Sequence, residues 1–205
     1  MSGSLYDLGV PYPIWDDRPS PAEASARSAA RQGAQVHAVI ARLAPLVPLV
    51  GDDDLMIEAA VSAFVVGREN GNLRRARVRV SLLVRQYLRV FLPRAAVFAG
   101  SEVPAGGGRA DLLWAHPVGY FYDEVKTTTD PDPLSPATVE QVSRYAAAGR
   151  ARFGPRFVGV RLVTLGRERD AAFMDPTGAL TPLSVSPLAP TALAETALAV
   201  GRTPA

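Results

Sequence analysis

The chain has 205 residues, of which 48% are hydrophobic and 20% are charged, and its formal net charge is +2. This length suits one domain with an appendage, and the apolar content is sufficient for a packed core. The chain has no cysteine and two histidines. Disulfides, thiolate metal sites, iron–sulfur clusters and multi-histidine metal sites are therefore excluded.

The N-terminal part of the chain is predicted to be helical. Residues 1–20 lack the basic start and apolar run of a secretory signal, and no window holds the ~20 apolar residues of a membrane span. We therefore expect a cytoplasmic protein without membrane contact, in which residues 1–50 form an extended arm and a helix. That helix is expected to begin after a Ser20 cap and to end at Pro45. Two further helices are predicted over 52–66 and 73–92.

Short apolar segments separated by turn residues predict strands in the second half. The first three segments should form an antiparallel meander, and a helix and a long apolar strand should follow them. A short last strand is expected near 171–175, and the Ala/Pro-rich tail 184–205 has no assignment. Residues 51–183 therefore predict an α/β domain with a mixed central sheet. The predicted ranges are 95–103, 109–116 and 120–127 for the meander, 136–152 for the helix and 156–165 for the strand.

Lys126 is the single lysine among 22 basic residues, and all the others are arginines. Ala, Arg, Gly, Pro and Val dominate the chain, as expected from a GC-rich coding sequence, in which arginine replaces lysine wherever either serves. The exception points to a position where arginine does not serve. Lysine differs from arginine in being a compact point donor with a shiftable pKa.

Two carboxylates are predicted to lie beside this lysine. Glu124 and Lys126 point to the same side of a strand, about 6.6 Å apart along the chain. If strands 109–116 and 120–127 pair, Asp111 meets them at the open end of the hairpin. Two carboxylates with the backbone carbonyl of Val125 make a hard-oxygen site suited to Mg²⁺ or Mn²⁺. An ammonium group beside that site can steer a water molecule or balance transition-state charge on a phosphoryl group.

This pattern, Asp111 followed by Glu124-Val125-Lys126, resembles the D…(D/E)-x-K motif of the PD-(D/E)XK, or restriction-endonuclease-like, nuclease superfamily. Gln141 and Tyr145 match the Q-x-x-x-Y pair of its RecB-like and lambda-exonuclease-like branches. The resemblance covers roughly residues 73–165. It implies a restriction-endonuclease-like core with flanking helices and an N-terminal helical extension. It also implies Mg²⁺-dependent phosphodiester hydrolysis, in this superfamily usually of DNA, and the sequence leaves the choice between DNA and RNA open.

The resemblance also implies roles for the matched residues. Asp111 and Glu124 would bind the metal with the Val125 carbonyl, and Lys126 would position the attacking water. Gln141 and Tyr145 would support the site or contact the nucleic-acid backbone. Some branches add a glutamate from the helix before the sheet. Glu69 is the preferred candidate here, with Glu58 and Glu102 as alternatives.

Four arginines share one face of the predicted helix 73–92, and they form either a solvated face or a track that contacts phosphates. These four are Arg74, Arg77, Arg85 and Arg89. Both histidines, His37 and His116, are expected to be incidental, and His116 flanks the hairpin turn at the opposite end from Asp111.

A second class of function stays open at this point. The same fold can serve as a catalytically inactive module that binds nucleic acid or assembles with other subunits. For an active enzyme the biological context is also open. A toxin or effector would be accompanied by an inhibitor or immunity protein, and a phage-defence or repair enzyme would not.

Overall fold

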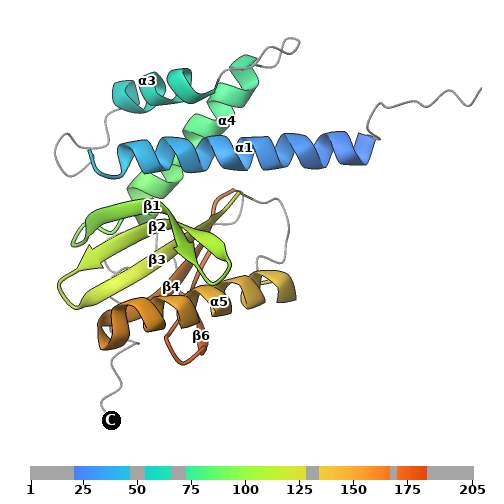
Figure 1. Cartoon of the computed structure of the whole chain (residues 1–205). Coiled ribbons are helices and arrows are strands. Elements are labelled where there is room, and N and C mark those ends of the chain that lie inside the picture. The colour runs from blue at the N-terminus through green and yellow to red at the C-terminus, as the bar shows by residue number, and fades with distance from the viewer. Residues whose placement is uncertain (1–20, 47–53, 66–72, 128–133, 167–169, 184–205) are drawn as a thin grey trace, which may run out of the picture.

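The computed structural model describes residues 21–46, 54–65, 73–127, 134–166 and 170–183. The expected arm 1–20, the tail 184–205 and Glu69 lie outside these ranges. A six-stranded mixed sheet is covered by helices on both faces, with α1, α3 and α4 on one side and α5 on the other (Figure 1). The predicted α/β class with a mixed sheet is confirmed.

The helices follow the predicted boundaries closely. They are α1 (Pro21–Leu43), α3 (Asp54–Phe64), α4 (Leu73–Gln86) and α5 (Pro136–Phe153). One π-helical turn, Tyr87–Phe91, continues α4, where the sequence predicted an unbroken helix, and a 3₁₀ turn, Gly154–Arg156, follows α5. Ser135 caps α5, because its side chain accepts a hydrogen bond from the Thr138 amide at 3.4 Å.

The strands lie in the sheet in their chain order. They are β1 (Val97–Ala105), β2 (Gly108–His116), β3 (Gly119–Lys126), β4 (Phe157–Thr164), β5 (Asp170–Met174) and β6 (Leu180–Leu183). Strands β1 to β3 form the predicted antiparallel meander, and α5 carries the chain over to β4, which pairs parallel to β3. The sequence did not predict β6, a four-residue edge strand that contains Pro182, because proline in so short a segment hides the strand pattern.

Both faces of the sheet bury apolar side chains. Residues of α1, among them Val36 and Ile40, share one core with α3, α4 and the sheet residues Leu112 and Trp114. A second core forms between the sheet and α5. The described part of the N-terminal segment is therefore packed into the same body as the sheet. Among the described helices, none combines the length and the apolarity that a membrane crossing requires.

A charged cluster is buried on the α1/α4 side of the sheet. The Arg161 guanidinium donates to both carboxylate oxygens of Asp123, at 2.8 and 2.6 Å. Oδ2 of Asp123 also accepts hydrogen bonds from the Tyr87 hydroxyl at 2.6 Å and the Trp114 indole at 3.0 Å. All four side chains are almost completely buried. This cluster ties β3 to β2, β4 and the π-helical turn.

Candidate functional site

The candidate functional site lies where β2 and β3 separate. Their ladder runs from the pair His116–Gly119 at the hairpin turn to the pair Leu112–Asp123. One step further, Oδ2 of Asp111 accepts a hydrogen bond from the Val125 amide at 2.7 Å. A side-chain carboxylate thus binds the amide of the second residue after the last ladder pair on β3. The predicted meeting of Asp111 with the end of β3 is found, and His116 lies at the opposite end of the hairpin.

The other predicted site residues form a continuous hydrogen-bond chain. The Lys126 ammonium donates to Oε1 of Glu124 at 2.7 Å and to Oε1 of Gln141 at 2.8 Å. The Gln141 amide donates to Oε1 of Glu124 and to the Tyr145 hydroxyl, each at 2.9 Å. The Tyr145 hydroxyl in turn donates to the Arg109 carbonyl at 2.8 Å. Positions 141 and 145 are one helical turn apart, so α5 presents Gln141 to β3 and Tyr145 to β2.

Glu124 is buried with one of its two oxygens lacking a partner. Only 3% of the residue is exposed, and no described group bonds to Oε2. Burial, followed by the negative charge of Asp111, raises the pKa of Glu124 to about 7, although Lys126 and His37 act in the opposite direction. A buried acceptor without a donor is costly in a folded protein unless something binds it. This oxygen is therefore suited to a bound cation or proton.

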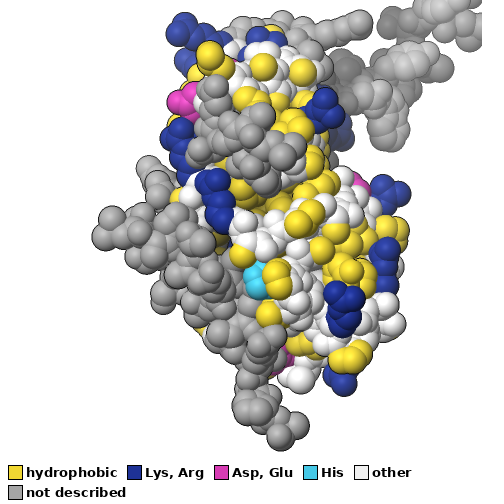
Figure 2. Space-filling view, turned by 90° about the vertical axis from the view of Figure 1, so that its left-hand side faces the viewer, with side chains coloured by type: hydrophobic (Ala, Val, Ile, Leu, Met, Phe, Trp, Pro, Cys, Tyr) yellow, Lys and Arg dark blue, Asp and Glu magenta, His cyan; other side chains and the backbone are white. Residues whose placement is uncertain are grey.

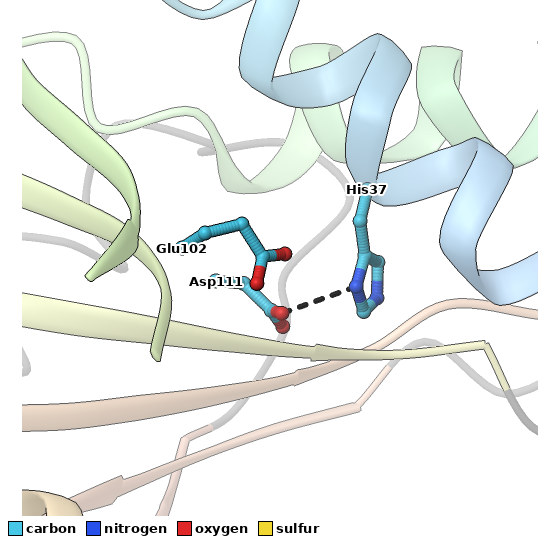
Figure 3. Close-up of side chains that lie close together, drawn as sticks. All are labelled: His37, Glu102 and Asp111. Atoms are coloured by element: carbon cyan, nitrogen blue, oxygen red, sulfur yellow. Dashed lines mark ion pairs between the residues drawn. The ribbon is translucent and has the colours of Figure 1, made fainter. Parts of the chain in front are cut away.

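His37 reaches the site from α1. Its Nδ1 lies 3.1 Å from Oδ1 of Asp111, an ion pair when the ring is protonated (Figure 3). Its Nε2 donates to the Val125 carbonyl at 2.8 Å. A ring protonated on both nitrogens would satisfy both of these acceptors and would carry a positive charge. Burial alone would lower the pKa of His37, but the hydrogen bond and charge of Asp111 outweigh it and raise the pKa above its ordinary value. His37 therefore contacts two groups that the sequence assigned to a metal, and its raised pKa favours a positive charge there.

Glu102 lies beside the same pair. One ligand atom each from His37, Glu102 and Asp111 lies within 4.8 Å of the others (Figure 3). Glu102 is an exposed residue of β1, and it is the one non-glycine residue with positive φ, 51°, in the described part of the chain. A register shift between Phe98 and Gly100 precedes it in the strand. Strained residues of this kind concentrate at functional sites.

A glycine permits the close approach of α1 to β3. Gly33 lies one turn before His37, and a Cβ atom at this position would lie 3.0 Å from the Thr127 hydroxyl. A larger residue would require the Thr127 side chain to give way at the end of β3. Sequence reasoning missed His37 because it belongs to no recognised motif. The available signal was a titratable side chain on the apolar stripe of a helix, between the buried Val36 and Ile40.

The predicted arginine face is largely engaged in helix packing. Arg85 donates to Asp54 at 3.0 Å and to Glu58 at 2.8 Å, and Arg89 donates to Asp54 at 2.8 Å. Arg77 donates to backbone carbonyls at the end of α3 and just after it. Three of the four arginines thus hold α4 against α3, and Glu58 lies in this contact instead of at the site. Figure 2 shows basic side chains over the helical layer and the lower part of one face, with exposed apolar side chains between them and few acidic ones.

The donor set of the site determines what it can bind. Among the described residues, the ligand atoms that converge are those of His37, Glu102 and Asp111, and Glu124 does not belong to this group. Carboxylate oxygens and the Val125 carbonyl are ligands of the kind that suits Mg²⁺ or Mn²⁺, and a deprotonated His37 can add a nitrogen ligand. The imidazolium would have to release a proton before its nitrogen could bind an ion. Comparison of the chain with protein-family models, curated proteins and solved structures finds no match.

Proposed function

We propose that the chain is a divalent-metal-dependent nuclease that hydrolyses phosphodiester bonds, in DNA rather than RNA. The observation that carries this proposal is the buried Glu124 carboxylate. Its Oε2 has no partner among the described residues, the charge of Asp111 acts on it, and the only lysine of the chain is bonded to its other oxygen. A structural ion pair would not need the second carboxylate.

The cofactor of the proposal is Mg²⁺ or Mn²⁺. The residues that would hold it are Asp111, Glu124 and the Val125 carbonyl, with His37 and Glu102 as additional ligands on the α1 and β1 side. When bound, such an ion polarises a phosphoryl oxygen and lowers the pKa of a water molecule. His37 in its protonated form and the metal ion would compete for the same two acceptors, the Asp111 carboxylate and the Val125 carbonyl.

Lys126 supplies a positive charge at a fixed place. Glu124 and Gln141 hold its ammonium group by two hydrogen bonds, and one of its three N–H donors is left for a water molecule or phosphate oxygen. Gln141 is held in turn by Tyr145, whose hydroxyl is bound to the Arg109 carbonyl. Gln141 and Tyr145 thus position the ammonium, and the ammonium acts on the substrate.

Cleavage of circular and linear DNA in Mg²⁺ tests the proposal. We expect the wild type to cut, and Asp111→Ala and Lys126→Ala to lose at least about 100-fold in rate, the order found when one electrostatic donor is removed from an active site. Lys126→Arg keeps the charge but not the compact donor, and the same order of loss is expected. Glu140→Gln, on the exposed side of α5, is the matched control and should cut normally.

Two outcomes would count against the enzyme. Undiminished cleavage by Lys126→Ala would show that Lys126 takes no part in catalysis and would contradict the proposed mechanism. A wild type that cuts neither DNA nor RNA in Mg²⁺ or Mn²⁺ would favour the inactive restriction-endonuclease-like module. Circular substrate separates endonuclease from exonuclease action in the same assay. The cytoplasmic location and the biological context stay predictions.

A further inference from the structure

An exposed surface with both basic and aliphatic side chains lies on α4, outside the candidate functional site. Arg75, Val78, Arg79 and Leu82 follow the spacing i, i+3, i+4, i+7 and share one side of the helix with Arg74. All five are exposed, and the two aliphatic side chains are more than half exposed, at 54% for Val78 and 59% for Leu82. Together they line a shallow hollow of about 390 Å³. We call these five residues the α4 outer face.

The arginines of this face have no partner among the residues that the structure describes. Neither a hydrogen bond nor an ion pair engages Arg74, Arg75 or Arg79, whereas Arg77, Arg85 and Arg89 all bind α3 or the residue after it. The opposite side of α4 is buried in the core. The N-terminal half of α4 lies with α3 on the far side of α1 from the sheet (Figure 1). Three unneutralised positive charges are thus gathered around two exposed aliphatic side chains.

The mixture of charge and apolar surface decides what kind of partner fits. Phosphates of a nucleic acid would pair with the guanidinium groups but would leave Val78 and Leu82 against a polar backbone, with no gain from their exposed surface. A protein segment with carboxylates beside an apolar stripe satisfies both features, and the two-turn length of the face suits the anchors of an amphipathic helix.

We propose that the α4 outer face docks an acidic amphipathic helix of a protein partner. The carboxylates of that helix pair with Arg74, Arg75 and Arg79, and its apolar stripe covers Val78 and Leu82. This contact leaves the Asp111–Glu124 site open, because none of the five residues takes part in it. The partner can therefore bind whether or not the chain is a nuclease.

Binding of labelled synthetic peptides, followed by fluorescence anisotropy with the full chain, tests the proposal. The probe is a short helical peptide with a leucine stripe flanked by glutamates. Two matched peptides replace the glutamates by glutamine or the leucines by serine, and a short DNA duplex is the fourth probe. We expect the Glu/Leu peptide to bind at least about tenfold more tightly than either matched peptide.

Two double variants locate the binding on α4. Each double variant should bind the Glu/Leu peptide about tenfold more weakly or worse than the wild type does. The two variants are Arg75→Glu/Arg79→Glu and Val78→Ser/Leu82→Ser. Arg27→Glu/Arg31→Glu, on the exposed part of α1, is the charge-matched control and should bind as the wild type does. Thermal unfolding shows that each variant is folded. The proposal would be overturned if the three peptides bound with the same affinity, or if the α1 control lost as much affinity as the α4 variants. It would also be overturned if the α4 variants changed binding of the DNA duplex alone.

Discussion

Asp123 and Glu124 are consecutive residues of β3 and are both buried, with 0% and 3% of each residue exposed. Because strand side chains alternate, they point to opposite faces of the sheet. Asp123 meets the permanently charged Arg161 and two further donors, so both of its oxygens are bonded. Glu124 is acted on by the negative charge of Asp111, and one of its oxygens has no described partner.

This contrast separates two uses of a buried carboxylate. A carboxylate whose charge and hydrogen bonds are satisfied by the protein holds the fold together. One that is left incomplete depends on something that the described residues do not supply, which under the proposed function is a proton or a metal ion. Burial alone does not distinguish the two cases, but partners and neighbouring charge do.

The largest effect on stability is expected at Asp123. Asp123→Ala leaves the Arg161 charge buried without its counter-ion, which should lower the free energy of unfolding by about 3–5 kcal/mol. Urea unfolding measures this loss. Glu140→Ala, which removes an exposed pair with Arg144, should change it by no more than about 0.5 kcal/mol. A loss below about 1 kcal/mol in Asp123→Ala would mean that the cluster is not what holds these strands.

Glu124, unlike Asp123, should cost the protein stability when it is ionised, and the dependence of stability on pH measures this cost. Its pKa is about 7 in the folded chain and near 4.5 in an unfolded one, so the folded state binds this proton more tightly. Stability of the metal-free protein should therefore fall as pH rises from about 5 to 8. The raised pKa of His37 acts in the same direction above pH 6.5.

Glu124→Gln removes the titrating carboxyl while keeping its shape. We expect the free energy of unfolding of this variant at pH 8 to match that of the wild type or to exceed it by up to about 1–2 kcal/mol. It should also vary less with pH. Thermal unfolding across this pH range, without metal, is the measurement. A variant that is less stable than the wild type at pH 8, with an unchanged slope, would show that Glu124 is a satisfied structural residue like Asp123.

The sequence predicted much of this architecture because its signals are local. The turn residues around the meander, the Ser135 cap and the apolar strands fixed every element from 95 to 165 within a few residues. The hairpin register brought Asp111 to the end of β3, and helical spacing brought Gln141 and Tyr145 to one side of α5. His37 could not be found in this way, since it reaches the site only through the packing of α1 across the sheet. The partners of Arg85 and Arg89 depend on the same kind of tertiary contact.

The smallest effect is expected at Glu102. Its positive φ is costly for a residue with a long side chain, and asparagine tolerates this conformation better. Glu102→Asn should therefore gain up to about 1 kcal/mol in stability and bind Mn²⁺ a few times more weakly. Glu102→Gln keeps the strain and loses the charge, so it should weaken Mn²⁺ binding without the gain. If Glu102→Asn and Glu102→Gln were equally stable, the positive φ at this position would carry no measurable cost in stability.

Calorimetric titration of the full chain with Mn²⁺ near pH 7 tests the central claim most directly. The account predicts saturable binding that releases protons from Glu124 and His37, seen as a heat that depends on the buffer. Binding should be lost in Asp111→Ala and Glu124→Gln and kept in Glu140→Gln. Absence of Mn²⁺ binding by the wild type, or undiminished binding by Glu124→Gln, would contradict the assignment of these carboxylates to a metal.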